Sequence, residues 1–155
     1  MAPLMDLVAG DRREILLVLA VEDWDAFADR ERFPSHLSLG GGLDPDWLDR
    51  FSEAARRVTG RPDPVDFIVA RLELRDAAVS ERTVERIDAA WIAAVAALES
   101  GELDAVAGRW IDLLEEELGD LPREEKPAVR TFARQIVDFA RAADTAPAVL
   151  LAWSL

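Results

Sequence analysis

Apolar residues recur at three- and four-residue steps most regularly between residues 80 and 144. This spacing is typical of amphipathic helices, because residues three or four apart share one face of a helix. We predict three helices here, with apolar faces formed by Val84, Ile87, Trp91, Val95 and Leu98; by Leu103, Val106, Trp110, Leu113, Leu114 and Leu118; and by Val129, Phe132, Ile136, Phe139 and Ala143. Ser80 is expected to cap the first helix, while Gly101 and Gly119 end the first and the second. Their short connections predict an antiparallel three-helix bundle over 80–144.

The N-terminal part of the chain contains one further candidate helix. Asp11 precedes an apolar set that follows helical steps as far as Ala28, and Glu14 occupies the position of a capping-box acid. A buried strand over Ile15–Val21 is the alternative, because a short apolar run does not distinguish strand from helix. Residues 1–10 are mixed in character, and we expect their start to be loosely held.

A loop and another helix follow. Residues 33–43 are predicted to be a loop, because Pro34 disfavours helix in the residue before it and three consecutive glycines leave the backbone free. The pair Asp44-Pro45 combines an N-cap residue with proline at the first helical position. The helix that starts there is expected to end at Gly60 after about four turns.

Two short segments are candidate strands. Residues 65–74 fit either a helix or an alternating strand, and residues 147–155 are apolar and bounded by proline. A buried strand needs a partner, so we favour pairing 65–74 with 147–155. The predicted fold class is therefore mainly α, or α+β with a small sheet. It has about five helices in a single globular domain over 1–155.

Charge and composition narrow the classes of partner. The net charge of −13 disfavours nucleic acid and anionic membranes, both of which would repel the protein. The longest apolar run, Ile15–Val21, is far shorter than the roughly 20 residues that span a bilayer. No secretory signal is recognised at the start, and the chain has no cysteine, so we expect a cytoplasmic protein without disulfides. A basic or apolar protein surface, including a second copy of the chain, is the expected partner.

The glycine-rich loop is the best candidate for a ligand site. A pocket beneath it would have Trp24 and Trp47 as walls, and His36 or an arginine such as Arg32 or Arg50 would orient the ligand. The loop glycines are Gly40, Gly41 and Gly42. They match no nucleotide-binding fingerprint, and Asp44 would repel a phosphate. His36 is the only histidine, and no catalytic triad motif or metal-ligand spacing includes it, so we predict no metal and no cofactor.

Two features point to an interface instead. Asp112, Glu115 and Glu116 share one side of the second bundle helix, where close like charges call for a basic group across from them. Trp153 lies in the terminal segment, which could pair as a strand across a dimer axis.

Three functions remain from this pattern. The preferred hypothesis is a non-catalytic interaction or regulatory module that associates with itself or with a basic protein surface. The alternative is a small-ligand binder that uses the pocket under residues 33–43. A carboxylate-dependent enzyme ranks third, because it would require a buried Asp or Glu with a raised pKa.

Overall fold

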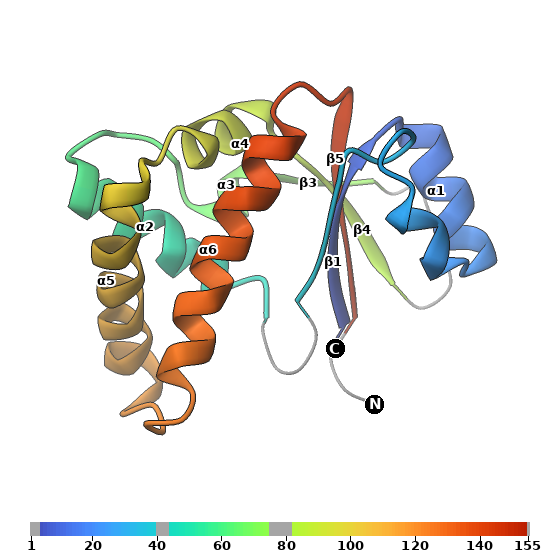
Figure 1. Ribbon diagram of the computed structural model, residues 1–155. Helices are drawn as coiled ribbons and strands as arrows, with labels where there is room; N and C mark the ends of the chain where they lie inside the picture. Colours follow the sequence, from blue (N-terminus) through green and yellow to red (C-terminus); the bar gives the residue numbers. More distant parts are fainter. Residues whose placement is uncertain (1–3, 40–43, 75–81, 155) are drawn as a thin grey trace.

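Helices and the strands of one β-sheet are interspersed along the chain in the computed structural model, which describes residues 4–39, 44–74 and 82–154 (Figure 1). The elements in chain order are β1 (Leu4–Gly10), α1 (Arg12–Val21), the 3₁₀ helix η1 (Trp24–Ala28), β2 (Ser35–Ser38), α2 (Trp47–Thr59), α3 (Phe67–Ala70), β3 (Arg71–Glu73), β4 (Thr83–Ile87), α4 (Ala89–Ala96), α5 (Ser100–Leu118), α6 (Lys126–Ala143) and β5 (Ala148–Ser154).

The sheet has five strands in the order β2-β1-β5-β4-β3, and every neighbouring pair is antiparallel. Its centre is the pair of β1 and β5, which runs in register from Leu4 opposite Ser154 to Gly10 opposite Ala148. The prediction of a mainly α chain, or of one with only a small sheet, is therefore wrong. The fold is α+β with a substantial sheet.

Helices cover both faces of this sheet. Figure 1 shows α1 on one side and α2, α4, α5 and α6 on the other. Side chains alternate along β1, so that Met5 and Leu7 enter the core beneath the larger helical layer while Val8 enters the core beneath α1. Burial on both faces explains why β5 is almost uniformly apolar and not alternating.

Coverage on both faces also explains a wrong assignment at residues 83–87. Val84 and Ile87 fit a helical step of three, but they lie in strand β4 and point to opposite faces of the sheet. Both side chains are buried because each face carries its own helical layer. A spacing of three therefore has the same appearance in a buried helix and in a strand covered on both sides.

The predicted strand pair is also wrong in its partners. Residues 148–154 do form a strand, but it pairs with β1 and β4 and not with 65–74. Within 65–74, Phe67–Ala70 is a helical turn, and only Arg71–Glu73 is a strand, paired with β4. The sequence pattern predicts no element within residues 1–10, but Leu4–Gly10 forms a central strand. This strand pairs with β5 over seven residues and is the partner that β5 required.

Several predicted helix ends are confirmed. Asp11 caps α1, its Oδ1 accepting the N–H of Glu14 at 3.1 Å. Gly60 and Gly119 end α2 and α5 with positive φ angles of 70° and 84°. The third bundle helix runs over Lys126–Ala143 as expected.

Other boundaries differ from the prediction. Gly101 lies inside α5, whose start is capped by Glu99, and α4 begins after the cap residue Asp88. Ser80 lies outside the described residues. The helix from Asp11 stops at Val21 and is followed by η1. Within the expected loop 33–43, Ser35–Ser38 forms the edge strand β2. Asp44 forms a turn with Asp46, and α2 starts one residue later.

Two tryptophans organise the larger helical layer. Trp91 and Trp110 are both almost completely buried. The indole N–H of Trp91 donates to Ser52 Oγ at 3.0 Å, and that of Trp110 donates to the carbonyl of Trp47 at 2.9 Å. Both buried N–H groups are therefore satisfied, as buried polar groups must be. None of the helices in the described residues is long and apolar enough to cross a membrane.

Replacing Gly10 and Gly108 by alanine should change stability in opposite directions. Gly10 has φ of 156°, and a Cβ there would lie 3.0 Å from the carbonyl oxygen of Arg32 and 3.1 Å from Phe33 Cδ1. We expect Gly10→Ala to lower the free energy of unfolding by about 1–3 kcal/mol. Gly108→Ala inside α5 should raise it by about 0.5–1 kcal/mol, because alanine is the better helix former. Urea unfolding measures both, and a stabilising Gly10→Ala would contradict the close approach at the end of β1.

Candidate functional site

A hollow of about 130 Å³ lies at the end of the sheet where β5 finishes. It is lined by Asp44, Pro45, Asp46, Arg71 and Trp153. We call it the Trp153 pocket. The turn before α2 supplies the first three residues, while β3 and β5 supply the last two. The pocket therefore exists only because side chains from three distant segments of the chain meet on one face of the sheet.

A buried carboxylate holds two walls of this pocket in place. Trp153 Nε1 donates a hydrogen bond to Glu85 Oε1, and Glu85 Oε2 lies 3.4 Å from Arg71 Nε. Glu85 is 7% exposed, and it projects from the same face of the sheet as Trp153 because Thr83, two residues earlier, is directly opposite Trp153. Arg71 also lies over the Phe67 ring, 5.5 Å from its centroid.

The pocket carries an excess of negative charge. Asp44, Asp46 and Glu85 contribute three carboxylates against the single guanidinium of Arg71. Glu85 compensates Arg71 from below, whereas Asp46 is 3.9 Å from Arg71 Nη2 with a side chain that is 71% exposed. Three carboxylates around one guanidinium leave an excess of negative charge, and an aromatic ring beside such an excess is an arrangement that attracts a cation.

A second polar cluster lies on the opposite face of the sheet, beneath α1. Asp6 is 4% exposed, with its Oδ1 3.0 Å from His36 Nε2 and its Oδ2 3.0 Å from Arg82 Nη1. The guanidinium of Arg82 lies 4.2 Å from the ring centroid of Trp24, and the ring of His36 lies 5.1 Å from that of Phe27. We call these residues the Asp6 cluster.

Asp6 is held as a carboxylate by its neighbours. Burial by itself raises the pKa of Asp6, but hydrogen bonds from His36, Arg82 and Ser38 outweigh that effect, so the pKa is lowered from 3.8. A histidine oriented by a buried carboxylate supplies two of the three members of a catalytic triad. Here the Ser38 hydroxyl forms a hydrogen bond with Asp6, and no hydroxyl among the described residues forms one with His36. The cluster therefore ties β1, β2 and the start of β4 together.

Asp49 is the one described carboxyl group whose pKa is raised. Burial is the main cause, and the hydrogen bond from the Ile68 backbone N–H, at 2.7 Å, opposes it. That bond ties α2 to the start of α3, which gives Asp49 a structural use. Among the described residues, no group of three or more His, Asp or Glu side chains is arranged to hold a metal ion.

The structure separates the residues that we expected to share a ligand pocket. Trp24 and His36 lie together in the Asp6 cluster. Trp47 packs on the other side of the sheet, with the larger helical core. Gly40, Gly41 and Gly42 lie outside the described residues. Arg71, Glu85 and Asp46 were missed, because only the pairing of β4 with β5 and β3 brings them to Trp153.

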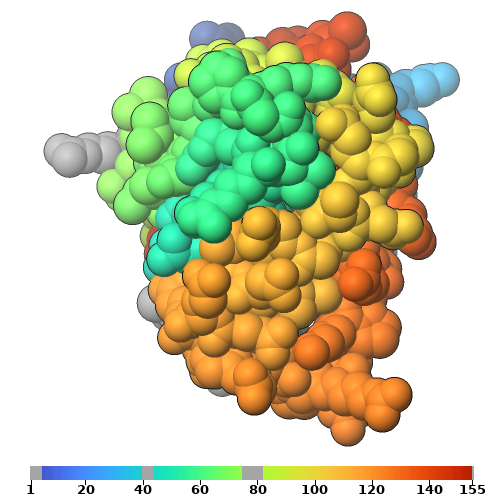
Figure 2. Space-filling model, turned by 90° about the vertical axis from the view of Figure 1, so that its left-hand side faces the viewer, coloured from blue at the N-terminus to red at the C-terminus, as the bar shows by residue number. Residues whose placement is uncertain are grey.

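The acidic residues of α5 have basic neighbours within the molecule. Glu115 lies 3.5 Å from Lys126, and Glu117 lies 2.9 Å from Arg50 of α2. Asp112 and Glu116 are exposed. Figure 2 shows α2 and α5 on one face of the molecule. Residues of these two helices line an open hollow, namely Arg50, Glu53, Leu113, Glu116 and Glu117. The basic group expected across from these acids is thus present for Glu115.

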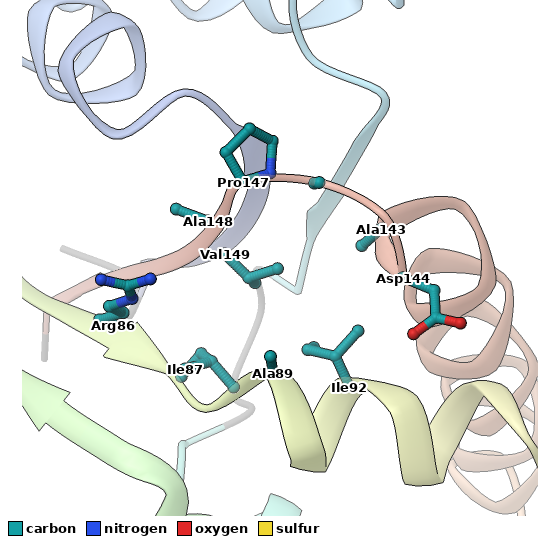
Figure 3. A pocket seen from close by; sticks show the side chains of 10 residues that line it. Arg86, Ile87, Ala89, Ile92, Ala143, Asp144, Pro147, Ala148 and Val149 are labelled. Atoms are coloured by element: carbon teal, nitrogen blue, oxygen red, sulfur yellow. The ribbon is translucent and has the colours of Figure 1, made fainter.

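A smaller cavity lies at the opposite end of the sheet (Figure 3). It is bounded by the start of α4, the end of α6 and the start of β5, with Arg86 and Asp144 on different sides. Its volume is about 40 Å³. That space holds one or two water molecules and is too small for a ligand.

Comparisons of this chain with protein family models, with curated proteins and with solved structures find no match. The chemistry of the Trp153 pocket is therefore the basis on which a function can be argued.

Replacing Asp6 by asparagine should destabilise the fold strongly at neutral pH. The substitution leaves Arg82, whose side chain is only 10% exposed, without its charged partner, which costs about 3 kcal/mol. The folded pKa of Asp6 lies below 3.8, so the wild-type carboxylate stabilises the fold above that pH and loses its effect as pH falls through the lowered pKa. The difference between wild type and Asp6→Asn should therefore shrink in acid.

Urea unfolding at several pH values measures this difference. Asp25→Asn, at an exposed position of η1, is the matched control and should change the free energy of unfolding by less than about 0.5 kcal/mol. A difference between wild type and Asp6→Asn that stays constant down to the acid limit would contradict the lowered pKa.

Proposed function

We propose that this protein is a cytoplasmic, non-catalytic interaction module whose Trp153 pocket receives a basic side chain of a partner protein. The observation that carries the proposal is an open hollow in which an indole ring stands beside two aspartates. The indole N–H of Trp153 is already satisfied by Glu85, so the ring is held in a fixed position. Trp153 is half-buried and lines the pocket, so its ring is available for contact.

Electrostatics favour a cationic group in this pocket. A guanidinium or ammonium over an indole ring contributes about 0.5–2 kcal/mol, with the larger value where water is excluded. Asp44 and Asp46 add attraction at the rim, because Glu85 already compensates Arg71. At longer range, the net charge of −13 attracts a basic surface and accelerates its approach.

The size of the pocket supports a side chain over a whole metabolite. Sites for small-molecule ligands usually measure about 300–1,000 Å³. The 130 Å³ of the Trp153 pocket is well below that range. A single arginine or lysine side chain, anchored by its own protein, needs less room than a free ligand. The partner's surrounding surface then contributes the rest of the binding energy.

Fluorine NMR of protein labelled with 5-fluorotryptophan tests the proposal. The chain has five tryptophans, so the spectrum contains five signals. The signal that disappears in Trp153→Phe is that of Trp153. Titration with a tetra-arginine peptide should move the Trp153 signal to saturation and leave the buried Trp91 and Trp110 signals nearly unchanged. A tetraglutamate peptide should move none of them.

Two charge variants separate the pocket from general attraction. Asp44→Asn with Asp46→Asn should weaken binding of tetra-arginine by about tenfold, as expected for the loss of two ion pairs. Asp112→Asn with Glu116→Gln removes the same charge on α5 and should have little effect. Equal losses in the two double variants, or a Trp153 signal that does not move, would overturn the proposal.

A further inference from the structure

Strand β3 leaves one edge of the sheet unpaired within the described residues. It is last in the strand order, and its other edge pairs with β4. The N–H of Leu74 donates to Val84 and the carbonyl of Ala70 accepts from Asp88, both at 2.9 Å. Backbone groups of a strand alternate in direction, so those of Arg71 and Glu73 point away from β4. This outer edge therefore presents N–H and C=O groups that are ready to pair with another strand.

Exposed apolar side chains gather at the same place. Seven large apolar side chains are exposed among the described residues, and four of them fall within residues 65–72. These are Val65, Ile68, Val69 and Leu72, which are 39%, 58%, 72% and 66% exposed. Such a concentration beside an open strand edge is typical of a protein interface.

We propose that β3 pairs antiparallel with β3 of a second copy of this chain, about a two-fold axis at Leu72. The outward backbone groups determine this register, because Arg71 then exchanges two hydrogen bonds with Glu73 of the partner subunit, and Glu73 does so with Arg71 of the partner subunit. Leu72 faces Leu72 of the partner subunit as a pair without hydrogen bonds. The two sheets join into one continuous sheet.

The sequence Arg71-Leu72-Glu73 is complementary to itself in this register. Residues directly opposite each other in an antiparallel pair project from the same face, so each arginine lies beside a glutamate of the other copy. Within one chain, Glu73 is directly opposite Glu85, which is a repulsive pair. Arg71 Nε is buried and donates no hydrogen bond to any described residue. A second copy brings an arginine to Glu73 and an additional carboxylate to Arg71.

This dimer goes beyond the proposed function and does not depend on it. Leu72 and Arg71 are consecutive residues of a strand, so Leu72 projects from the face opposite the Trp153 pocket. A strand of three residues limits the contact, and we expect a dissociation constant of about 1–10 μM. Substitutions at Leu72 should therefore change the dimer and leave binding of tetra-arginine unchanged.

Sedimentation equilibrium with charged variants at Leu72 tests the two-fold axis. At about 100 μM, well above the expected dissociation constant, wild type should have twice the mass of the 17.1 kDa chain. Leu72→Lys and Leu72→Glu should each be monomeric, because each places like charges opposite one another. An equimolar mixture of the two should recover the dimer mass, because lysine then faces glutamate.

Leu17→Lys is the matched control, since Leu17 is 63% exposed on α1, away from β3. This variant should remain dimeric, and circular dichroism should show all variants folded. A monomeric wild type, a dimer that survives both Leu72 variants, a mixture that stays monomeric or a dissociated Leu17→Lys would each overturn the proposal. Loss of tetra-arginine binding without loss of the dimer would instead count against the proposed function alone.

Discussion

The fold depends on the pairing of β1 with β5, which joins the two ends of the chain at the centre of the sheet. Both strands are buried on both faces, so this ladder separates two apolar cores and gives each helical layer a surface to pack on. Bringing together segments that far apart in sequence costs chain entropy. Burial of almost every β5 side chain offsets that cost.

The sheet also determines where charge can be buried. Asp6 enters the core beneath α1 and Glu85 enters the opposite core, and each is met by an arginine from another segment, Arg82 or Arg71. A buried carboxylate without such a partner would be strongly destabilising. The two pairs differ in use. The first is enclosed with His36 and links strands, whereas the second borders an open pocket and an open strand edge.

Arg71 connects the two proposals. Its guanidinium lines the Trp153 pocket, while its backbone forms part of the free edge of β3. A partner in the pocket and a second copy on the edge would therefore both contact the surroundings of Arg71. Glu85 is compatible with both contacts, because it holds the Arg71 side chain in place from within the core. The negative charges of Asp44 and Asp46 then remain in excess at the rim of the pocket.

The sequence by itself determined the features that depend on near neighbours. Local backbone chemistry predicts the cap at Asp11, the helix ends at Gly60 and Gly119, and the strand segment within residues 147–155. Only the tertiary structure decided that Val84 and Ile87 belong to a strand. In a strand buried on both faces, apolar residues three apart are both buried, and this spacing is the same as in an amphipathic helix. It alone placed Glu85 and Arg71 beside Trp153, since strand pairing depends on contacts between distant segments and no local pattern encodes them.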